Sequence, residues 1–217
     1  MYILLVIEIL IFAVAAPNFL SVNNLFNVLR QVSMLGIASC GLTFVILSGG
    51  MDLSVGAQIA LIGLIGGLMM TSLGVPVWLA VILMLLMGTA TGAFIGFLSV
   101  KLKIIPMIVT LAAMTSLTGV AKIITNGYPV YGFADSFANI GQGYIAGIIP
   151  IPVVIFLIVI LIACFILQKT YFGRYVYAMG SNAEAARLAG LNIDRMRIAI
   201  FAICGFFTSI ACVLMTA

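Results

Sequence analysis

The sequence predicts an all-α polytopic membrane protein, and three observations carry that prediction. Of its 217 residues, 65% are hydrophobic and only 6% are charged, whereas soluble domains are about 45–50% apolar and about 25% charged. If this chain formed a soluble fold, it would have too few polar residues to cover the surface. The apolar residues also fall into long stretches, most of them near the roughly 20 residues that a helix needs to cross a bilayer. The seven stretches are 2–16, 32–48, 54–73, 76–99, 104–125, 149–168 and 197–217.

The composition also excludes several classes of function. The net charge of +4 rests on only nine basic residues, so we interpret it as a signal of membrane orientation and expect no nucleic-acid partner. Histidine is absent, which removes imidazole metal ligands and imidazole acid–base chemistry. The cysteines form no CxxC motif and lie in apolar stretches, where cysteine behaves as a small hydrophobe. We therefore expect no catalytic residue and no metal site. The four cysteines are Cys40, Cys164, Cys204 and Cys212.

The first and last stretches need separate interpretation. The first is short for a span, but no basic region precedes it and Glu8 lies in its middle. We interpret it as a retained helix, with a cleaved signal peptide as the alternative. The last stretch stops at Thr216-Ala217 without a polar flank, which suggests a piece of a longer protein. The range 1–217 is interpreted as one incomplete transmembrane domain.

The basic residues predict the orientation of the spans. Lys and Arg near helix ends mark the cytoplasmic side, and seven of the nine basic residues fall in two loops separated by two spans. These are Lys101, Lys103, Lys169, Arg174, Arg187, Arg195 and Arg197. By alternation the N-terminus lies inside, and the segments 17–31 and 126–148 lie outside. Arg30 is the one basic residue left in an outer loop. The aromatic residues of 126–148, Phe133 and Phe137 among them, suit either a membrane interface or a docking surface.

Small residues within the fourth stretch predict close helix packing. Gly88, Gly92 and Gly96 form a GxxxGxxxG ridge. Helices in a bilayer associate through such small-residue contacts because lipid tails are as apolar as leucine.

The first interruption of the apolar pattern is Ser48-Gly-Gly-Met-Asp-Leu-Ser-Val-Gly56. Glycine permits a tight turn here, and Asp52 or Ser54 is a candidate cap for the following helix. Because an ionised carboxylate at bilayer depth costs about 2.5–3.5 kcal/mol, we expect Asp52 at the interface, in a polar crevice or tied to backbone amides. A capped turn and a position lining a transport pathway both fit this pattern.

The second interruption, 169–197, is the longest polar stretch. Ser181-Asn-Ala-Glu184 matches a capping box, and Gly190 is a natural left-handed stop. They predict a short helix over 182–189, with Glu184 and Arg187 paired at i,i+3. So short a helix is marginal alone in water, so it must pack against another protein, the membrane or its own bundle.

At this point the chain resembles a known family. Glu184-Ala-Ala-x-x-x-Gly190, with Ile200 farther on, resembles the "EAA" signature of bacterial ABC importer permeases, although the usual I-x-L-P ending is here Ile200-Phe-Ala-Ile. Two further segments are similar to the ribose-type permeases of the carbohydrate branch, and a third leads into the short helix as that family's does. They are 18–27, the motif 49–56 and Phe172-Gly-Arg-Tyr-Val-Tyr-Ala-Met-Gly-Ser-Asn182.

The resemblance implies a multi-pass inner-membrane permease subunit with the vitamin-B12-importer fold, importing a sugar or sugar-like solute. Its partners would be an ABC ATPase subunit, a periplasmic solute-binding protein, a second permease subunit in a homo- or heterodimer, and membrane lipid. ATP would be bound by the ATPase, since this sequence has no G-x-x-x-x-G-K-[ST] loop. Members usually have about ten helices, three more than are found here.

The resemblance also implies roles for individual residues. The short helix would be a coupling helix seated in a groove of the ATPase subunit. The residues expected to couple are Glu184, Ala185, Ala186 and Gly190, with Arg174 and Asn182 orienting the loop. Asp52 and Ser54 would shape the translocation pathway or its inner mouth. Two alternatives stay open, an ion-coupled secondary transporter and a passive channel.

Overall fold

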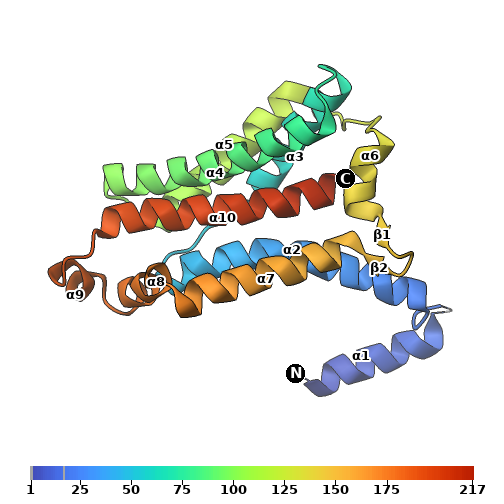
Figure 1. Cartoon of the computed structure of the whole chain (residues 1–217), viewed down its shortest axis with the longest axis horizontal. Coiled ribbons are helices and arrows are strands. Elements are labelled where there is room, and N and C mark those ends of the chain that lie inside the picture. Colours follow the sequence, from blue (N-terminus) through green and yellow to red (C-terminus); the bar gives the residue numbers. More distant parts are fainter. Residues whose placement is uncertain (1, 17) are drawn as a thin grey trace.

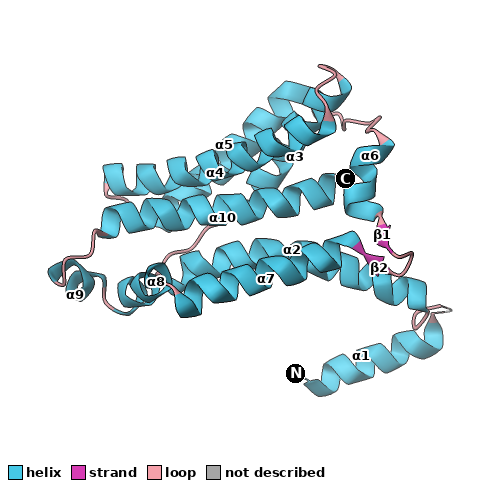
Figure 2. Cartoon of the chain, viewed as in Figure 1, coloured by secondary structure: helices cyan, strands magenta, loops and turns pink. Residues whose placement is uncertain are grey.

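The computed structural model describes residues 2–16 and 18–217 and is almost entirely helical (Figures 1 and 2). The helices are α1 Tyr2–Ala15, α2 Val22–Leu47, α3 Val55–Thr71, α4 Val77–Leu102, α5 Pro106–Thr125, α6 Asp135–Gln142, α7 Ile151–Lys169, α8 Tyr171–Ser181, α9 Ala183–Leu188 and α10 Ile193–Thr216. A two-stranded antiparallel hairpin joins β1 Tyr144–Ile145 to β2 Ile149–Pro150. Each of the seven predicted apolar stretches is thus built around one helix.

Five of these helices are long and apolar enough to cross a membrane: α2, α4, α5, α7 and α10. The other two apolar helices, α1 and α3, are shorter. The prediction of an all-helical polytopic protein is confirmed at this level, whereas the count of seven spans stays a prediction.

Helix α10 is the centre of the bundle. It packs against α4 and α3 on one side and α2 on the other, and α7 covers α2 (Figure 1). It is the most buried of the five long helices. Helix α1 projects from the bundle with its side chains mostly exposed, whereas α8 and α9 lie together at one end (Figure 1).

The glycine ridge of α4 faces α10, as its spacing predicts. A Cβ added at Gly92 would overlap the carbonyl oxygen of Phe201, and one at Gly205 would overlap that of Gly88. The two backbones therefore approach as closely as glycine permits, which is the contact geometry that small-residue ridges allow in membranes.

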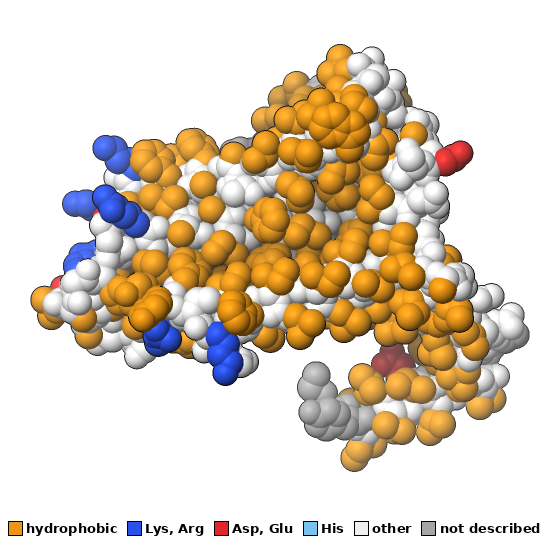
Figure 3. Space-filling model, viewed as in Figure 1, with side chains coloured by type: hydrophobic (Ala, Val, Ile, Leu, Met, Phe, Trp, Pro, Cys, Tyr) orange, Lys and Arg blue, Asp and Glu red, His pale blue; other side chains and the backbone are white. Residues whose placement is uncertain are grey.

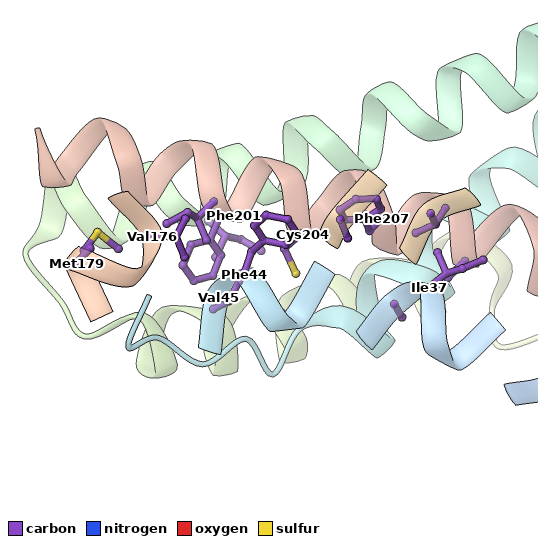
Figure 4. Close-up of a cluster of buried hydrophobic side chains, with 14 of the residues drawn as sticks. Ile37, Phe44, Val45, Val176, Met179, Phe201, Cys204 and Phe207 are labelled. Atoms are coloured by element: carbon purple, nitrogen blue, oxygen red, sulfur yellow. The ribbon is translucent and has the colours of Figure 1, made fainter. Parts of the chain in front are cut away.

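The largest apolar cluster joins α2, α8 and α10. Phe44 stacks on Phe207 with ring centroids 6.0 Å apart, and both rings are almost fully buried. Figure 4 labels the surrounding side chains, which come from all three helices. They are Ile37, Val45, Val176, Met179, Phe201 and Cys204. Helix α8 is therefore part of the core, although its residues are predicted to belong to a polar loop.

The segment 126–148 is more ordered than a loop, since it contains α6 and β1. Phe137 is fully buried in a second apolar cluster, so its predicted place at the membrane interface is wrong. Arg30 donates to the carbonyl of Gln142 at 3.2 Å and lies over the Tyr144 ring. This exception to the charge rule thus has partners on the same end of the bundle as α6.

The Lys and Arg side chains visible in Figure 3 gather at the end of the bundle occupied by α8 and α9. This clustering is the pattern on which the predicted orientation depends, because cytoplasmic ends carry an excess of positive charge.

Candidate functional site

The polar stretch 169–197 contains the predicted coupling helix, so we call it the coupling segment. It forms two helices and the start of a third. Thr170 sits between α7 and α8: its hydroxyl donates to the carbonyl of Ile166 at 2.6 Å and accepts from the Gly173 amide at 3.2 Å. Thr170 is therefore the N-cap of α8. A hydroxyl side chain suits this role because it accepts a hydrogen bond from one of the helix's first free backbone amides.

Helix α8 buries one narrow face. Gly173, Val176 and Met179 are buried at a spacing of three residues, so they lie along one side of the helix. Next to this face, a Cβ at Gly180 would overlap the carbonyl oxygen of Leu47, the last residue of α2. The absence of a side chain at Gly180 therefore sets how closely α8 can approach the end of α2.

Arg174 lies on the outer side of α8. Its guanidinium carbon is 4.2 Å from the centroid of the Tyr171 ring, which is a cation–π contact. Both side chains are exposed. The structure places Arg174 on the first turn of α8, near Thr170, whereas Asn182 lies at the opposite end of that helix.

Asn182 joins α8 to α9. Its backbone N–H donates to the carbonyl of Ala178, and its side-chain Oδ1 accepts from the backbone N–H of Ala185 at 2.9 Å. It is therefore the C-cap of one helix and the N-cap of the next. The predicted capping box is wrong, because Ser181 is the last residue of α8 and the helix after it is Ala183–Leu188, shorter than 182–189.

Helix α9 is capped at both ends, and most of its side chains are exposed. Of the predicted coupling residues, Ala186 is buried, whereas Glu184 and Ala185 are exposed. Leu188 is 82% exposed, which leaves an apolar side chain on the outside of a polar segment. Gly190 has φ +90°, as predicted for a left-handed stop.

The charged residues of α9 do not pair as predicted. The Arg187 guanidinium lies 3.9 Å from a carboxylate oxygen of Asp194, at the start of α10, and both side chains are well exposed. Within the described part of the chain this contact replaces the expected pair with Glu184. An exposed pair at this distance contributes little to stability.

The first interruption is a helix break between α2 and α3, here called the break segment (48–54). Ser48 ends α2 by donating its hydroxyl to the Val45 carbonyl at 2.7 Å, and Gly49 has φ +80°. The chain then continues without helix until Ser54, the N-cap of α3, whose side chain makes no capping bond.

Asp52 is buried within the break segment and tied to local donors. Its Oδ1 accepts from the Ser54 amide at 2.8 Å and from the Ser54 hydroxyl at 2.6 Å. The side-chain amide of Gln58 donates to the Ser54 hydroxyl at 2.9 Å. The expectation that Asp52 is tied to a backbone amide is confirmed. Ser54 occupies the predicted N-cap position of α3, but the predicted side-chain capping bond is wrong, because neither side chain makes one.

The other carboxylate oxygen of Asp52 faces α10. The Cys204 thiol lies 3.8 Å from Oδ2, and Cys204 is near the middle of α10. The break segment therefore runs from the end of α8, where Gly49 approaches Gly180, to the interior of the bundle.

Two arms of the coupling segment, α8 and α10, lead to the break, and α10 reaches it beyond residue 197. On one arm, Gly180 of α8 lies against Leu47, directly before the break. On the other, α10 begins right after α9 and reaches Asp52 through Cys204.

Comparison with known proteins places this arrangement in a family. Residues 24–217 match the family described as "Branched-chain amino acid transport system / permease component". The chain belongs to this permease family. It is 42% identical to the ribose import permease protein RbsC of Haemophilus influenzae over 99% of its length, and 41% identical to that of Escherichia coli over 95%.

Other relatives of the permease carry different names. The xylose transport system permease protein XylH of Escherichia coli is 31% identical over 89% of this chain, which matches 64% of XylH. The chain spans about two thirds of the length of the RbsC relatives, 67% in Haemophilus influenzae and 65% in Escherichia coli. No solved structure matches the permease.

The sequence did not predict two contacts in the permease, the one between Asp52 and Cys204 and the one between Gly180 and Leu47. Cys204 is 152 residues from Asp52, and no local pattern links a cysteine in an apolar stretch to a distant carboxylate. Gly180 precedes the predicted helix and lacked an interpretation. A signal for α8 was available in the three-residue spacing of Gly173, Val176 and Met179, which gives one buried helix face. Within residues 2–16 and 18–217, no cluster of three metal-ligating side chains is found.

Asp52 gives a testable prediction for the stability of the permease. Replacing it with alanine leaves the buried Ser54 amide and hydroxyl without their acceptor, which costs about 1–3 kcal/mol. Asp52→Asn keeps one acceptor oxygen and should cost less. The measurement is thermal unfolding of the purified protein in detergent. Asp135→Ala, at an exposed carboxylate, is the control and should change the free energy of unfolding by less than about 0.5 kcal/mol. Equal losses for Asp52→Ala and Asp135→Ala would contradict the account.

Proposed function

We propose that the protein is the membrane-spanning permease subunit of an ATP-binding-cassette importer for a sugar or sugar-like solute. The family description names branched-chain amino acids, whereas similar proteins include import permeases named for ribose, xylose and autoinducer 2. Identity to the ribose permeases over nearly the whole chain favours a sugar. Transport, rather than catalysis, is the proposed activity.

One observation carries the proposal. Helix α9 is a six-residue helix, capped by Asn182, ended by Gly190 and presenting the exposed Leu188. A helix this short gains little stability by itself in water. Its caps hold it in place at the end of the bundle (Figure 1), and its exposed face suits a groove on another protein. We propose that the protein that supplies this groove is the ATPase subunit.

The proposed mechanism follows from the two contacts of the coupling segment. ATP binding and hydrolysis in the partner displace α9, and α8 and α10 transmit the displacement to Leu47 and Asp52. The break segment then exchanges between two arrangements, each favoured by a different partner state. In this scheme the residues that transmit the motion of the ATPase to the permease are Glu184, Ala185, Ala186 and Gly190. Arg174 and Asn182 position the two ends of α8.

Further parts of the proposal concern assembly and orientation. The coupling segment 169–197 faces the cytoplasm with the N-terminus, and 17–31 and 126–148 face a periplasmic solute-binding protein. Two permease subunits, identical or related, enclose the pathway in a vitamin-B12-importer-like fold with seven spans in 1–217. Asp52, which faces Cys204 of α10, and the buried Ser54 shape the pathway by holding the break segment. ATP binds to the partner subunit.

Co-purification tests this function against an ion-coupled transporter. The full-length protein is expressed together with its neighbouring genes, solubilised in detergent and purified through a tag on the permease. We expect a stoichiometric ATPase subunit whose activity rises when the loaded solute-binding protein is added. Solute uptake that follows the proton or sodium gradient, with no ATPase in the preparation, would overturn the proposal.

A further inference from the structure

A crevice of about 700 Å³ opens at the basic end of the bundle, between the end of α4, the start of α5, and α9 with the start of α10. Three basic side chains line it, Lys103, Arg187 and Arg197, together with one carboxylate, Asp194. Asp194 lies against Arg187. Within the described residues Lys103 and Arg197 have no carboxylate partner, so the crevice has an excess of positive charge and favours an anion.

The wall of the crevice at Lys103 is a fixed turn. Lys103 ends α4 with φ +54°, a left-handed conformation that costs a non-glycine residue about 1–2 kcal/mol. The Ser99 hydroxyl donates to the carbonyl of Ile104 at 2.9 Å and fastens the turn. A long basic side chain therefore occupies a position that glycine would occupy with less strain, and this side chain lines the crevice.

A second cavity lies next to the first and shares a lining residue with it. It is an apolar groove of about 300 Å³ between α4 and α5, and Ile104 lines both cavities. From Leu102 up to Thr91 the groove follows α4 for about 16 Å at 1.5 Å per residue. Leu102 and Ile108 on its rim are exposed. Because α4 and α5 are both apolar enough to span a membrane, this groove lies at the depth of lipid chains.

We propose that the two cavities together bind one anionic phospholipid. Its phosphate occupies the crevice beside Lys103 and Arg197, and one acyl chain lies in the groove between α4 and α5. Basic pockets between helices at the cytoplasmic side suit anionic headgroups, and the adjoining groove distinguishes a lipid from a soluble anion. The lipid would contact α9, α10, α4 and α5 at once, so it would tie the coupling segment to the spans. The site goes beyond the proposed transport function and does not depend on the solute.

The charge half of the site is tested by lipid binding to the full-length protein purified in detergent. Phosphatidylglycerol and phosphatidylcholine with identical acyl chains are added, and bound lipid is counted by native mass spectrometry. We expect tighter binding of phosphatidylglycerol. Each basic residue near an anionic surface is worth about fivefold in affinity, so Lys103→Gln with Arg197→Gln should weaken binding about thirtyfold. The control is Lys101→Gln with Lys169→Gln, which neutralises two basic residues at the same end that do not line the crevice.

The groove half is tested by filling it. Ala113 lines the groove, whereas Ala121 on the same helix does not. Ala113→Phe should lower phosphatidylglycerol binding at least about fivefold, and Ala121→Phe should leave it unchanged. Each of the following results would overturn the proposal: equal binding of both lipids, displacement of phosphatidylglycerol by millimolar inorganic phosphate, or full binding by Ala113→Phe. A lipid absent from the complex purified with its ATPase subunit would show that another protein fills the crevice, and would overturn it as well.

Discussion

Replacing Gly180 with valine is expected to abolish most transport while the protein still inserts into the membrane. A Cβ at this position would overlap the carbonyl oxygen of Leu47, and a backbone atom cannot move aside as a flexible side chain can. Overpacking of this kind costs about 1–3 kcal/mol. This cost corresponds to roughly a 5- to 150-fold change in the equilibrium constant between α8 packed against α2 and α8 moved away from it. Transport and binding-protein-stimulated ATPase activity of the reconstituted importer are the measurements.

The matched control for Gly180 is Gly119, a helical glycine of α5. Nothing lies within 4 Å of a Cβ added there, so Gly119→Val should retain activity and abundance. If Gly180→Val transports as well as Gly119→Val, then contact between α8 and α2 does not carry coupling. A loss of membrane-inserted protein in both variants would be traced to the bulk of valine beyond its Cβ. Gly180→Ala would then separate the two effects, because alanine adds only the Cβ that overlaps the Leu47 carbonyl oxygen.

Replacing Gly190 with leucine should lower transport and stimulated ATPase activity strongly while membrane insertion stays intact. The space around Gly190 is open, with nothing within 4 Å of an added Cβ, so the effect comes from the backbone alone. A left-handed φ costs leucine about 1–2 kcal/mol, and a six-residue helix has little stability with which to offset that cost. We expect α9 to lose its defined end and its fit to the partner.

Asparagine provides the control at this position, because it adopts the left-handed conformation more readily than other non-glycine residues. Gly190→Asn should keep most of the activity that Gly190→Leu loses. Equal activity of the leucine variant and the unmodified protein in the full-length importer would refute the coupling role of this turn. Equal loss in both variants would show that side-chain volume matters rather than backbone conformation.

The sequence was sufficient for the features that depend on local chemistry. Long apolar stretches gave the helices, the glycine spacing of α4 gave the face that meets α10, and the left-handed turn at Gly190 followed from the need for a helix stop. These features require only periodicity, hydropathy and backbone freedom. The family motifs gave the position of the coupling segment by resemblance, which periodicity alone does not supply.

Features that depend on distant contacts were not predictable in this way. Helix α8 contains two glycines and three tyrosines, which resemble a loop, and it is stabilised by burying Val176 and Met179 against α2 and α10. Asn182 outcompetes Ser181 as a cap because α8 continues through Ser181. Phe137 is buried because α6 packs against α10, a contact that amino-acid composition does not reveal.

The most direct test of the account is cross-linking from α9 to the ATPase subunit. Ala185 is exposed, so Ala185→Cys is introduced into the full-length importer after the accessible Cys40 and Cys164 are replaced by alanine. The account predicts a cross-link to the ATPase whose yield changes when ATP is added, and none from Tyr131→Cys on the opposite end. A cysteine at 185 that never reaches the ATPase in the intact complex, or that is labelled from outside intact cells by a membrane-impermeant thiol reagent, would contradict it.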